Sequence, residues 1–186
     1  EQFEVTTVTS AGQGLNNLTE QPFDCVVSDY DMPGKKGIEF LRAVREDHGE
    51  LPFILFTGKG SEEVASDAIS AGVTDYLQKK SGTDQYTVLA NRIQNAVDRQ
   101  RAERARQRNR EAIETAKEGI SILSEDGQYL YVNEAFADLY GYEPDEMIGE
   151  QWQLVYPDTG EVERVNQEIL PEVKREGNWH GTTTGL

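Results

Sequence analysis

The sequence predicts an incomplete doubly wound α/β domain, then a long helix, then a compact α+β domain. Three observations predict this order. Short apolar runs alternate with segments of helical spacing up to about residue 97. Residues 89–117 contain neither Pro nor Gly, which favours one continuous helix. After Gly119, two strand-like runs flank an Asp126-Gly127 pair, a strong signal for a β-hairpin turn.

The first part of the chain predicts a parallel sheet. Strand-like apolar runs bounded by turn residues occur at 3–8, 23–28, 51–57 and 74–78. Ser10 and Ser61 are expected to begin helices between these runs, Ile38 lies near the start of another, and Gly72 ends the last of them. Alternating strands and helices favour a flavodoxin-like parallel sheet with helices on both faces.

The long helix has two interpretations. Small residues recur on it at spacings of three and four, which is typical of a weak coiled-coil seam: Ala102, Ala105, Asn109, Ala112 and Ala116. A surface helix that only separates two domains has the same pattern. A homodimer formed through this helix and the domain after it is therefore one hypothesis, and a plain spacer is the other.

The last part of the chain predicts an α+β domain. The runs ISIL and YLYVN form the hairpin, Asn133 caps the segment NEAFADLYG, and Pro144 begins PDEMIG. An amphipathic stretch around Val165 follows, and residues 179–185 predict the start of a further strand.

Charge and hydropathy exclude several classes of partner. The formal net charge is -16, yet residues 92–110 alone carry +5 from seven arginines and two acids. The remaining acidic surface would repel phosphate backbones, so we expect no direct nucleic-acid binding by these domains, and it resembles the surface of halophilic proteins. The apolar runs fall far short of the roughly 20 residues that span a bilayer. The lone Cys25 suits a buried position, and we expect a cytoplasmic protein.

Three reactive side chains follow strand-like runs of the first domain. Asp29, Thr57 and Lys79 each stand at the carboxyl end of such a run. Because parallel strands end at one edge of their sheet, we expect these three side chains to converge there. A carboxylate, a hydroxyl and an ammonium suit capture of a phosphoryl group, with the carboxylate as nucleophile. Helix capping or surface exposure would explain the same residues without a function.

Residues 24–34, DCVVSDYDMPG, resemble the phosphoacceptor loop of two-component response-regulator receiver domains. FILFTG and AGVTDYLQK resemble the switch strand and the last strand of that family. The resemblance implies that Asp29 is the phosphoacceptor, Thr57 the switch hydroxyl, Tyr76 the switch aromatic residue and Lys79 the phosphate-pairing lysine. It also implies that Asp29 and the backbone carbonyl of Asp31 bind Mg²⁺.

The chain departs from the receiver pattern at its start. Receivers begin with a central strand that ends in an acidic pair holding the metal, and no such strand precedes residues 3–8. In the 2-1-3-4-5 strand order that strand would separate the runs at 3–8 and 23–28. We therefore expect a receiver without its first strand and helix, and poor phosphate acceptance by this chain alone.

Residues from about 110 onward resemble a PAS sensor domain. The hairpin, NEAFADLYGY and PDEMIG follow that family's order of motifs, and the chain stops before the last strands that the resemblance implies. Flavin photochemistry of the family needs a cysteine, and Cys25 lies in the other domain; the PAS ligand stays unknown. The predicted organisation is a receiver at 1–98, a linker helix at 99–110 and a PAS domain at 111–186.

The predicted function is phosphorelay signal transduction. A histidine kinase would phosphorylate Asp29, and the linker helix would pass a conformational change to the PAS module and an output domain. The sequence contains no kinase catalytic motif, and it leaves an enzymatic output undecided. The alternatives are a ligand-sensing or dimerisation module with a degenerate receiver, or part of a hybrid histidine kinase or transcriptional regulator.

Overall fold

The structure, a computed structural model, describes residues 3–58, 62–156 and 158–185. The chain divides into two compact units, Glu1–Ala105 and Arg106–Leu186. No helix in the described part of the chain is long and apolar enough to cross a membrane.

The first unit contains a three-stranded parallel sheet. Its strands are β1 (Val26–Ser28), β2 (Phe53–Thr57) and β3 (Asp75–Gln78), and they lie in the order β1-β2-β3. All pairings are parallel, with Ser28 opposite Leu55 and Thr57 opposite Gln78. The parallel flavodoxin-like sheet is confirmed, and three of the four predicted strand-like runs form strands.

One helix precedes the first strand and two helices connect the three strands. They are α1 (Ala11–Glu20), α2 (Gly37–His48) and α3 (Glu62–Ser70). The Ser10 hydroxyl accepts a hydrogen bond from a backbone N–H in the first turn of α1, as expected of an N-cap. Ser61, the predicted start of the third helix, lies outside the described residues.

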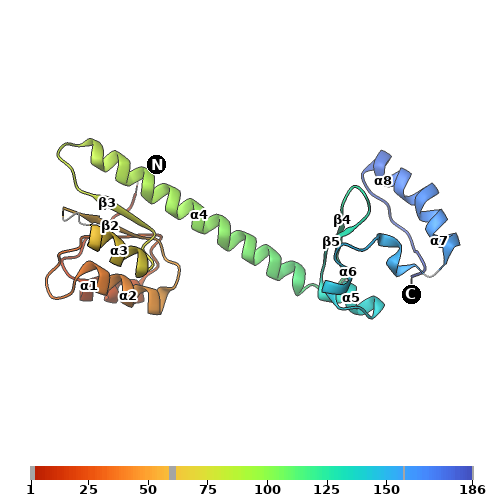
Figure 1. The fold of residues 1–186 in the computed structure, drawn as a ribbon, viewed down its shortest axis with the longest axis horizontal. Helices are drawn as coiled ribbons and strands as arrows, with labels where there is room; N and C mark the ends of the chain where they lie inside the picture. The colour runs from red at the N-terminus through yellow and green to blue at the C-terminus, as the bar shows by residue number, and fades with distance from the viewer. Residues whose placement is uncertain (1–2, 59–61, 157, 186) are drawn as a thin grey trace. The chain divides into compact units, whose positions relative to one another are not determined.

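Helices cover both faces of the sheet. Phe53 and Leu55 are fully buried and pack with Phe40 and Leu41 of α2 on one face. Alternate residues of a strand point to opposite faces, so Phe56 faces the other side, where it contacts the first turn of α4 (Asp84–Glu114). Figure 1 shows the sheet between α1 and α2 on one side and α4 on the other.

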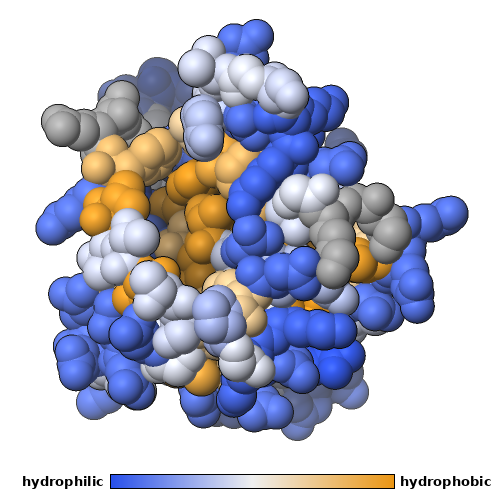
Figure 2. Space-filling model, turned by 90° about the vertical axis from the view of Figure 1, so that its left-hand side faces the viewer, coloured by the Kyte–Doolittle hydropathy of each residue, from blue (hydrophilic) through white to orange (hydrophobic). Residues whose placement is uncertain are grey.

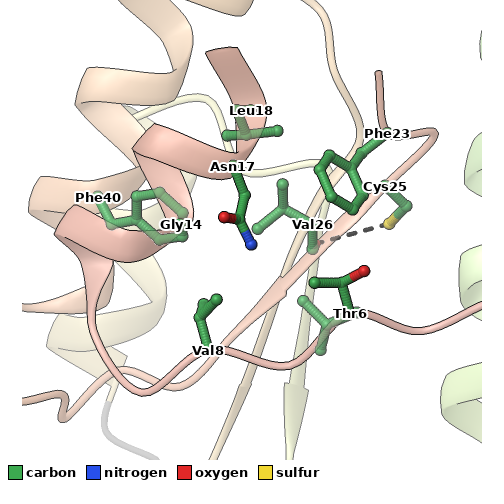
Figure 3. Close-up of a pocket in the computed structure, with 10 residues that line it drawn as sticks. Thr6, Val8, Gly14, Asn17, Leu18, Phe23, Cys25, Val26 and Phe40 are labelled. Atoms are coloured by element: carbon green, nitrogen blue, oxygen red, sulfur yellow. Dashed lines mark hydrogen bonds between the residues drawn. The ribbon is translucent and has the colours of Figure 1, made fainter. Parts of the chain in front are cut away.

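The predicted strand at residues 3–8 does not form. The segment has no ladder pairing in the described structure, and Val5 is 76% exposed. A groove lies between this segment and β1, and Figure 3 shows the side chains around it. The groove is lined by Thr6, Val8, Gly14, Asn17, Leu18, Phe23, Cys25, Val26, Val27 and Phe40. A strand needs a neighbouring backbone to satisfy its N–H and C=O groups. Residues 3–8 face the groove instead of such a backbone, so they form no strand.

The first unit also shows an apolar hollow on the face turned toward the viewer in Figure 2. Apolar residues form its floor and part of its rim, and hydrophilic residues lie along the right-hand side. Exposed apolar side chains of this unit include Val27 of β1, which is 42% exposed. Val27 pairs with Ile54, so it faces away from the core residues Phe53 and Leu55.

Helix α4 confirms the predicted long helix. It runs for 31 residues without interruption, and Val97 is its buried residue. Most of its side chains from Arg99 to Glu114 are exposed. Helical propensity and side-chain pairs along its own surface therefore contribute more to this part of α4 than apolar packing does.

The second unit begins with an antiparallel hairpin of β4 (Ser121–Leu123) and β5 (Tyr129–Val132). Gly127 in its turn has φ of 80°, a conformation that favours glycine. Short helices follow, and their bounds are α5 (Glu134–Tyr140), α6 (Pro144–Met147), η1 (Trp152–Val155), α7 (Thr159–Arg164), η2 (Val165–Ile169) and α8 (Leu170–Glu176). This arrangement confirms the predicted α+β domain.

The predicted strand at residues 179–185 is also wrong. This segment lies against α7 through side-chain hydrogen bonds and forms no ladder in the described structure. The Arg164 guanidinium donates to the Thr182 carbonyl at 3.2 Å, and the Thr184 N–H donates to the Glu161 carboxylate at 3.2 Å. These side chains satisfy backbone groups that a neighbouring strand would otherwise pair.

Candidate functional site

The predicted site residues converge at the carboxyl edge of the parallel sheet. Asp29 directly follows β1, Thr57 is the last residue of β2, and Lys79 directly follows β3. The Lys79 N–H donates to the Thr57 carbonyl at 2.8 Å, which continues the ladder past β3. Parallel strand direction therefore places the three residues side by side, although the sequence separates them by crossover connections.

Asp29 is the centre of this cluster. Its Oδ2 accepts a hydrogen bond from the Lys79 ammonium at 2.5 Å, and its Oδ1 accepts one from the Tyr30 backbone N–H at 2.6 Å. The Thr57 hydroxyl also hydrogen-bonds to the carboxylate. The Asp29 side chain stays 36% exposed, so a reactant can reach it from solvent.

Opposing effects set the pKa of Asp29. Burial raises the pKa, but hydrogen bonds from Lys79, Thr57 and the Tyr30 N–H, together with the Lys79 charge, outweigh that effect. The net pKa lies below the ordinary value. Asp29 is therefore a carboxylate at neutral pH, which is the nucleophilic form.

Replacing Lys79 with Met should raise the pKa of Asp29. The substitution removes both a hydrogen bond and a positive charge, while burial still raises the pKa. Because the folded-state pKa is depressed, the ionised site stabilises the fold above the unfolded pKa of about 3.9, and this stability is lost as pH falls through the folded pKa. NMR titration of the Asp29 carboxyl carbon measures the shift. An unchanged pKa in Lys79→Met would contradict the ion pair.

The remaining predicted site residues lie beside this cluster. Tyr76 of β3 is opposite Leu55 and is half-buried against the apolar core under the sheet edge. Asp31 is exposed, two residues beyond Asp29 in the same loop. The structure thus brings Asp29, Thr57 and Lys79 into contact, with Tyr76 on β3 and Asp31 in the loop after β1.

The residues present supply only part of a Mg²⁺ site. Asp29 and the Asp31 carbonyl are oxygen donors of the kind that Mg²⁺ prefers. The described residues contain no group of three His, Cys, Asp or Glu side chains that could hold a metal ion. The Lys79 ammonium moreover holds one Asp29 oxygen. These residues by themselves do not fit a complete Mg²⁺ site.

Gly37 at the start of α2 shapes the loop after Asp29, a role that the sequence pattern did not predict. Its N–H donates to the Tyr30 carbonyl at 2.8 Å, and a Cβ atom there would overlap the Asp29 backbone carbonyl. Only glycine permits this close approach of α2 to the loop. A glycine at the start of the helix that follows the Asp29 loop was the available signal.

Replacing Gly37 with Ala should destabilise the first unit by about 2 kcal/mol and displace Asp29, because the new methyl group overlaps backbone atoms. Gly12→Ala is the matched control. Gly12 lies within α1, and a methyl group at its Cα would meet nothing within 4 Å, so Ala should stabilise there by about 0.5 to 1 kcal/mol. Urea unfolding of both variants measures the difference. Equal effects in the two variants would show that the loop accommodates a side chain.

Burial keeps two reactive side chains outside this cluster, Cys25 and Tyr129, in their neutral forms. Burial, with the Asp24 charge, raises the pKa of the Cys25 thiol to about 12, so the thiolate is scarce at neutral pH. In the second unit, burial also raises the pKa of Tyr129 to about 12, and its hydroxyl donates to the Trp152 carbonyl at 3.3 Å. Tyr129 and its aromatic neighbours form the core of that unit.

Comparison with known proteins places both units in families. Residues 1–91 match the family model described as response regulator receiver domain, and residues 107–179 match the one described as PAS fold. The bacterioopsin transcriptional activator of Halobacterium salinarum is 28% identical over 79% of this chain and 24% of its own length. The transcriptional regulatory protein FixJ of Bradyrhizobium diazoefficiens is 36% identical over 47% of this chain and 42% of its own length.

A solved response regulator receiver domain from Clostridium thermocellum is 31% identical, with a TM-score of 0.48, and the match covers 53% of this chain and 78% of that chain. The chain spans less than half the length of the two curated relatives above. The receiver match covers the whole Asp29 cluster, and the PAS match covers the hairpin and the helices after it. The chain thus belongs to the response regulator receiver family over residues 1–91 and to the PAS family over residues 107–179.

Proposed function

We propose that this protein acts in a phosphorelay and that its receiver unit accepts a phosphoryl group on Asp29 from a histidine kinase. One observation carries the proposal: the Lys79 ammonium and the Thr57 hydroxyl both bind the Asp29 carboxylate at an exposed sheet edge. A structural ion pair alone does not need the hydroxyl as a third partner. Phosphoryl capture uses all three groups.

The proposed transfer forms one bond and breaks one. An Asp29 carboxylate oxygen attacks the phosphorus of a phosphohistidine, the P–N bond breaks, and its electron pair stays on the imidazole nitrogen. The product is an acyl phosphate on Asp29. Lys79 then pairs with phosphoryl oxygens, and the Thr57 hydroxyl donates to one of them.

The proposed response follows from the added charge. Phosphorylation adds about -1.5 to -2 charge at Asp29, so Thr57 and Tyr76 reposition toward the new group. The strands that end at Thr57 and Lys79 precede α4, which continues from the receiver unit to the PAS unit. A small change at the sheet edge can therefore bias the PAS module and the output that follows it.

The groove beside β1 supports one further part of the proposal. It lies between residues 3–8 and β1, where the receiver resemblance implies the strand that ends in the acidic pair. A strand seated in this groove would pair with β1 and bring acidic side chains to the carboxyl edge near Asp29. We therefore expect residues 1–186 alone to be labelled poorly, and the full-length protein to be labelled readily.

The proposed output is regulation of transcription, by analogy with the transcriptional regulators among the relatives. The second candidate function is a ligand-sensing or dimerisation module with a degenerate receiver. For dimerisation, Ala102, Asn109 and Ala112 are exposed on α4 and leave the predicted seam accessible.

The test is phosphoryl labelling of the full-length protein by a phosphorylated histidine kinase and by acetyl phosphate. The expected label is an acyl phosphate, which hydroxylamine removes and which maps to the peptide containing Asp29. A label that resists hydroxylamine indicates a Ser or Thr ester and contradicts the proposal. No label with either donor favours the degenerate receiver.

A further inference from the structure

The aromatic side chain of Phe56 lies under the ammonium group of the candidate site. The Lys79 Nζ atom is 5.6 Å from the centroid of the Phe56 ring, while the same ammonium contacts Asp29. A cation over an aromatic face at this distance is attracted by the ring's quadrupole. Phe56 precedes Thr57 on β2 and points to the opposite face of the sheet from Leu55 and Thr57.

Lys79 needs such support because its side chain is long and 41% exposed. A flexible four-carbon stem loses rotamer freedom when its ammonium is held at one position. The backbone of Lys79 is fixed by its hydrogen bond to Thr57, so the remaining freedom lies in the side chain. The Phe56 ring contacts that side chain and restricts its ammonium to a position beside Asp29.

The Phe56 ring is in turn held by helix α4. The rings of Phe56 and Tyr86 meet edge to face, with centroids 6.3 Å apart and an interplanar angle of 70°. Tyr86 lies in the first turn of α4, and its neighbour Gln85 accepts a hydrogen bond from the Lys80 N–H at 3.1 Å. A continuous set of contacts thus joins the Asp29 carboxylate to the start of α4.

We propose that Phe56 is a positioning residue, which aims the Lys79 ammonium at Asp29 and reports its position to α4 through Tyr86. The positioning of Lys79 is argued from the described contacts. Its effect on labelling and on α4 rests on the proposed phosphoryl transfer. When a phosphoryl group forms on Asp29, the ammonium follows the new oxygens and its place over the ring changes. The Tyr86 contact passes that change to the first turn of α4.

The first test measures geometry in the chain of residues 1–186 and needs no phosphorylation. The Phe56 ring current should move the Lys79 Cε proton resonances upfield, and Phe56→Leu should remove this shift. Lys36 is the internal control, because its Nζ lies 5.8 Å from the Tyr30 ring and its resonances should stay unchanged. Phe56→Tyr keeps a ring and should keep the Lys79 shift. Lys79 resonances that are identical in wild type and Phe56→Leu overturn the proposal.

The second test measures labelling of the full-length protein by acetyl phosphate. Phe56→Leu should slow labelling about threefold, and Phe56→Tyr should restore the rate. In a Lys79→Met background, Phe56→Leu should have no further effect, because Phe56 acts through the ammonium. An equal loss in both backgrounds shows a scaffold role and overturns the proposal.

The third test measures, by NMR, whether labelling changes the contact between Phe56 and Tyr86 of α4. Labelling should shift the Tyr86 ring resonances in wild type and should leave them in place in Phe56→Leu. Equal Tyr86 shifts in both proteins overturn the coupling. If wild-type Asp29 takes no label, the proposed function fails while the proton shifts of the first test still decide the positioning of Lys79.

Discussion

Replacing Asp29 with Asn will lower phosphoryl labelling of the full-length protein by more than about 100-fold. An amide oxygen has no negative charge to donate to phosphorus, and the amide nitrogen has its electron pair delocalised. The amide keeps the size of the carboxylate, so the loop and the strand before it should retain their structure. Labelling with acetyl phosphate, followed by gel autoradiography and peptide mapping, measures the loss.

Asp24→Asn is the matched control for this experiment. Asp24 lies just before β1 and Asp29 just after it; the Asp24 side chain is 67% exposed and pairs with Arg101 at 3.1 Å. Exposed ion pairs of this kind contribute little to stability, so labelling should stay at the wild-type rate. Asp29→Asn protein that labels as fast as Asp24→Asn would remove Asp29 from the phosphoacceptor role.

Replacing Asn133 with Leu will destabilise the second unit by about 3 kcal/mol. Asn133 is fully buried, and its side-chain oxygen accepts hydrogen bonds from the N–H groups of Ile120 and Phe136 at 2.8 and 3.0 Å. Its amide nitrogen donates to the carbonyls of Ile113 and Glu118, each at 3.0 Å. Leu provides none of these bonds, removes the N-cap of α5 and leaves buried polar groups unpaired.

Asn109→Leu is the control, because Asn109 is exposed on α4 and should change stability by less than about 0.5 kcal/mol. Calorimetry of the chain should show a lower transition temperature for the second unit in Asn133→Leu and an unchanged one for the receiver unit. Asn133 joins the last turn of α4 to the hairpin and to α5, so amide exchange in residues 111–120 should also accelerate. An unaltered second transition would show that the hydrogen-bond cluster is dispensable.

Much of the receiver site was predictable because the positions of its residues follow from local sequence patterns and from the parallel strand order. Short apolar runs ending in Asp29, Thr57 and Lys79 identify strand ends, and parallel pairing brings such ends to one edge. The caps at Ser10 and Asn133 were predictable for a similar reason, since a polar side chain before a helical segment satisfies N–H groups within three residues.

Other parts of the site depend on contacts between segments that are distant in the sequence, and no local pattern predicts such contacts. The fit of Gly37 against the backbone of the Asp29 loop arises only when β1 and α2 are in place. Phe56 belongs to an apolar run that is typical of an ordinary core strand. Its position beneath Lys79 follows from the ladder between β2 and β3 and from the packing of α4.

Local patterns in the chain were enough to locate the starts of helices, the apolar runs and the reactive residues that end them. Whether an apolar run becomes a strand depended instead on the folded surroundings. Residues 3–8 and 179–185 have the composition of strands, yet one faces a groove and the other is held by side chains of α7. The hydrogen bonds of a strand are made to another backbone, so its formation requires a neighbour that its own residues cannot supply.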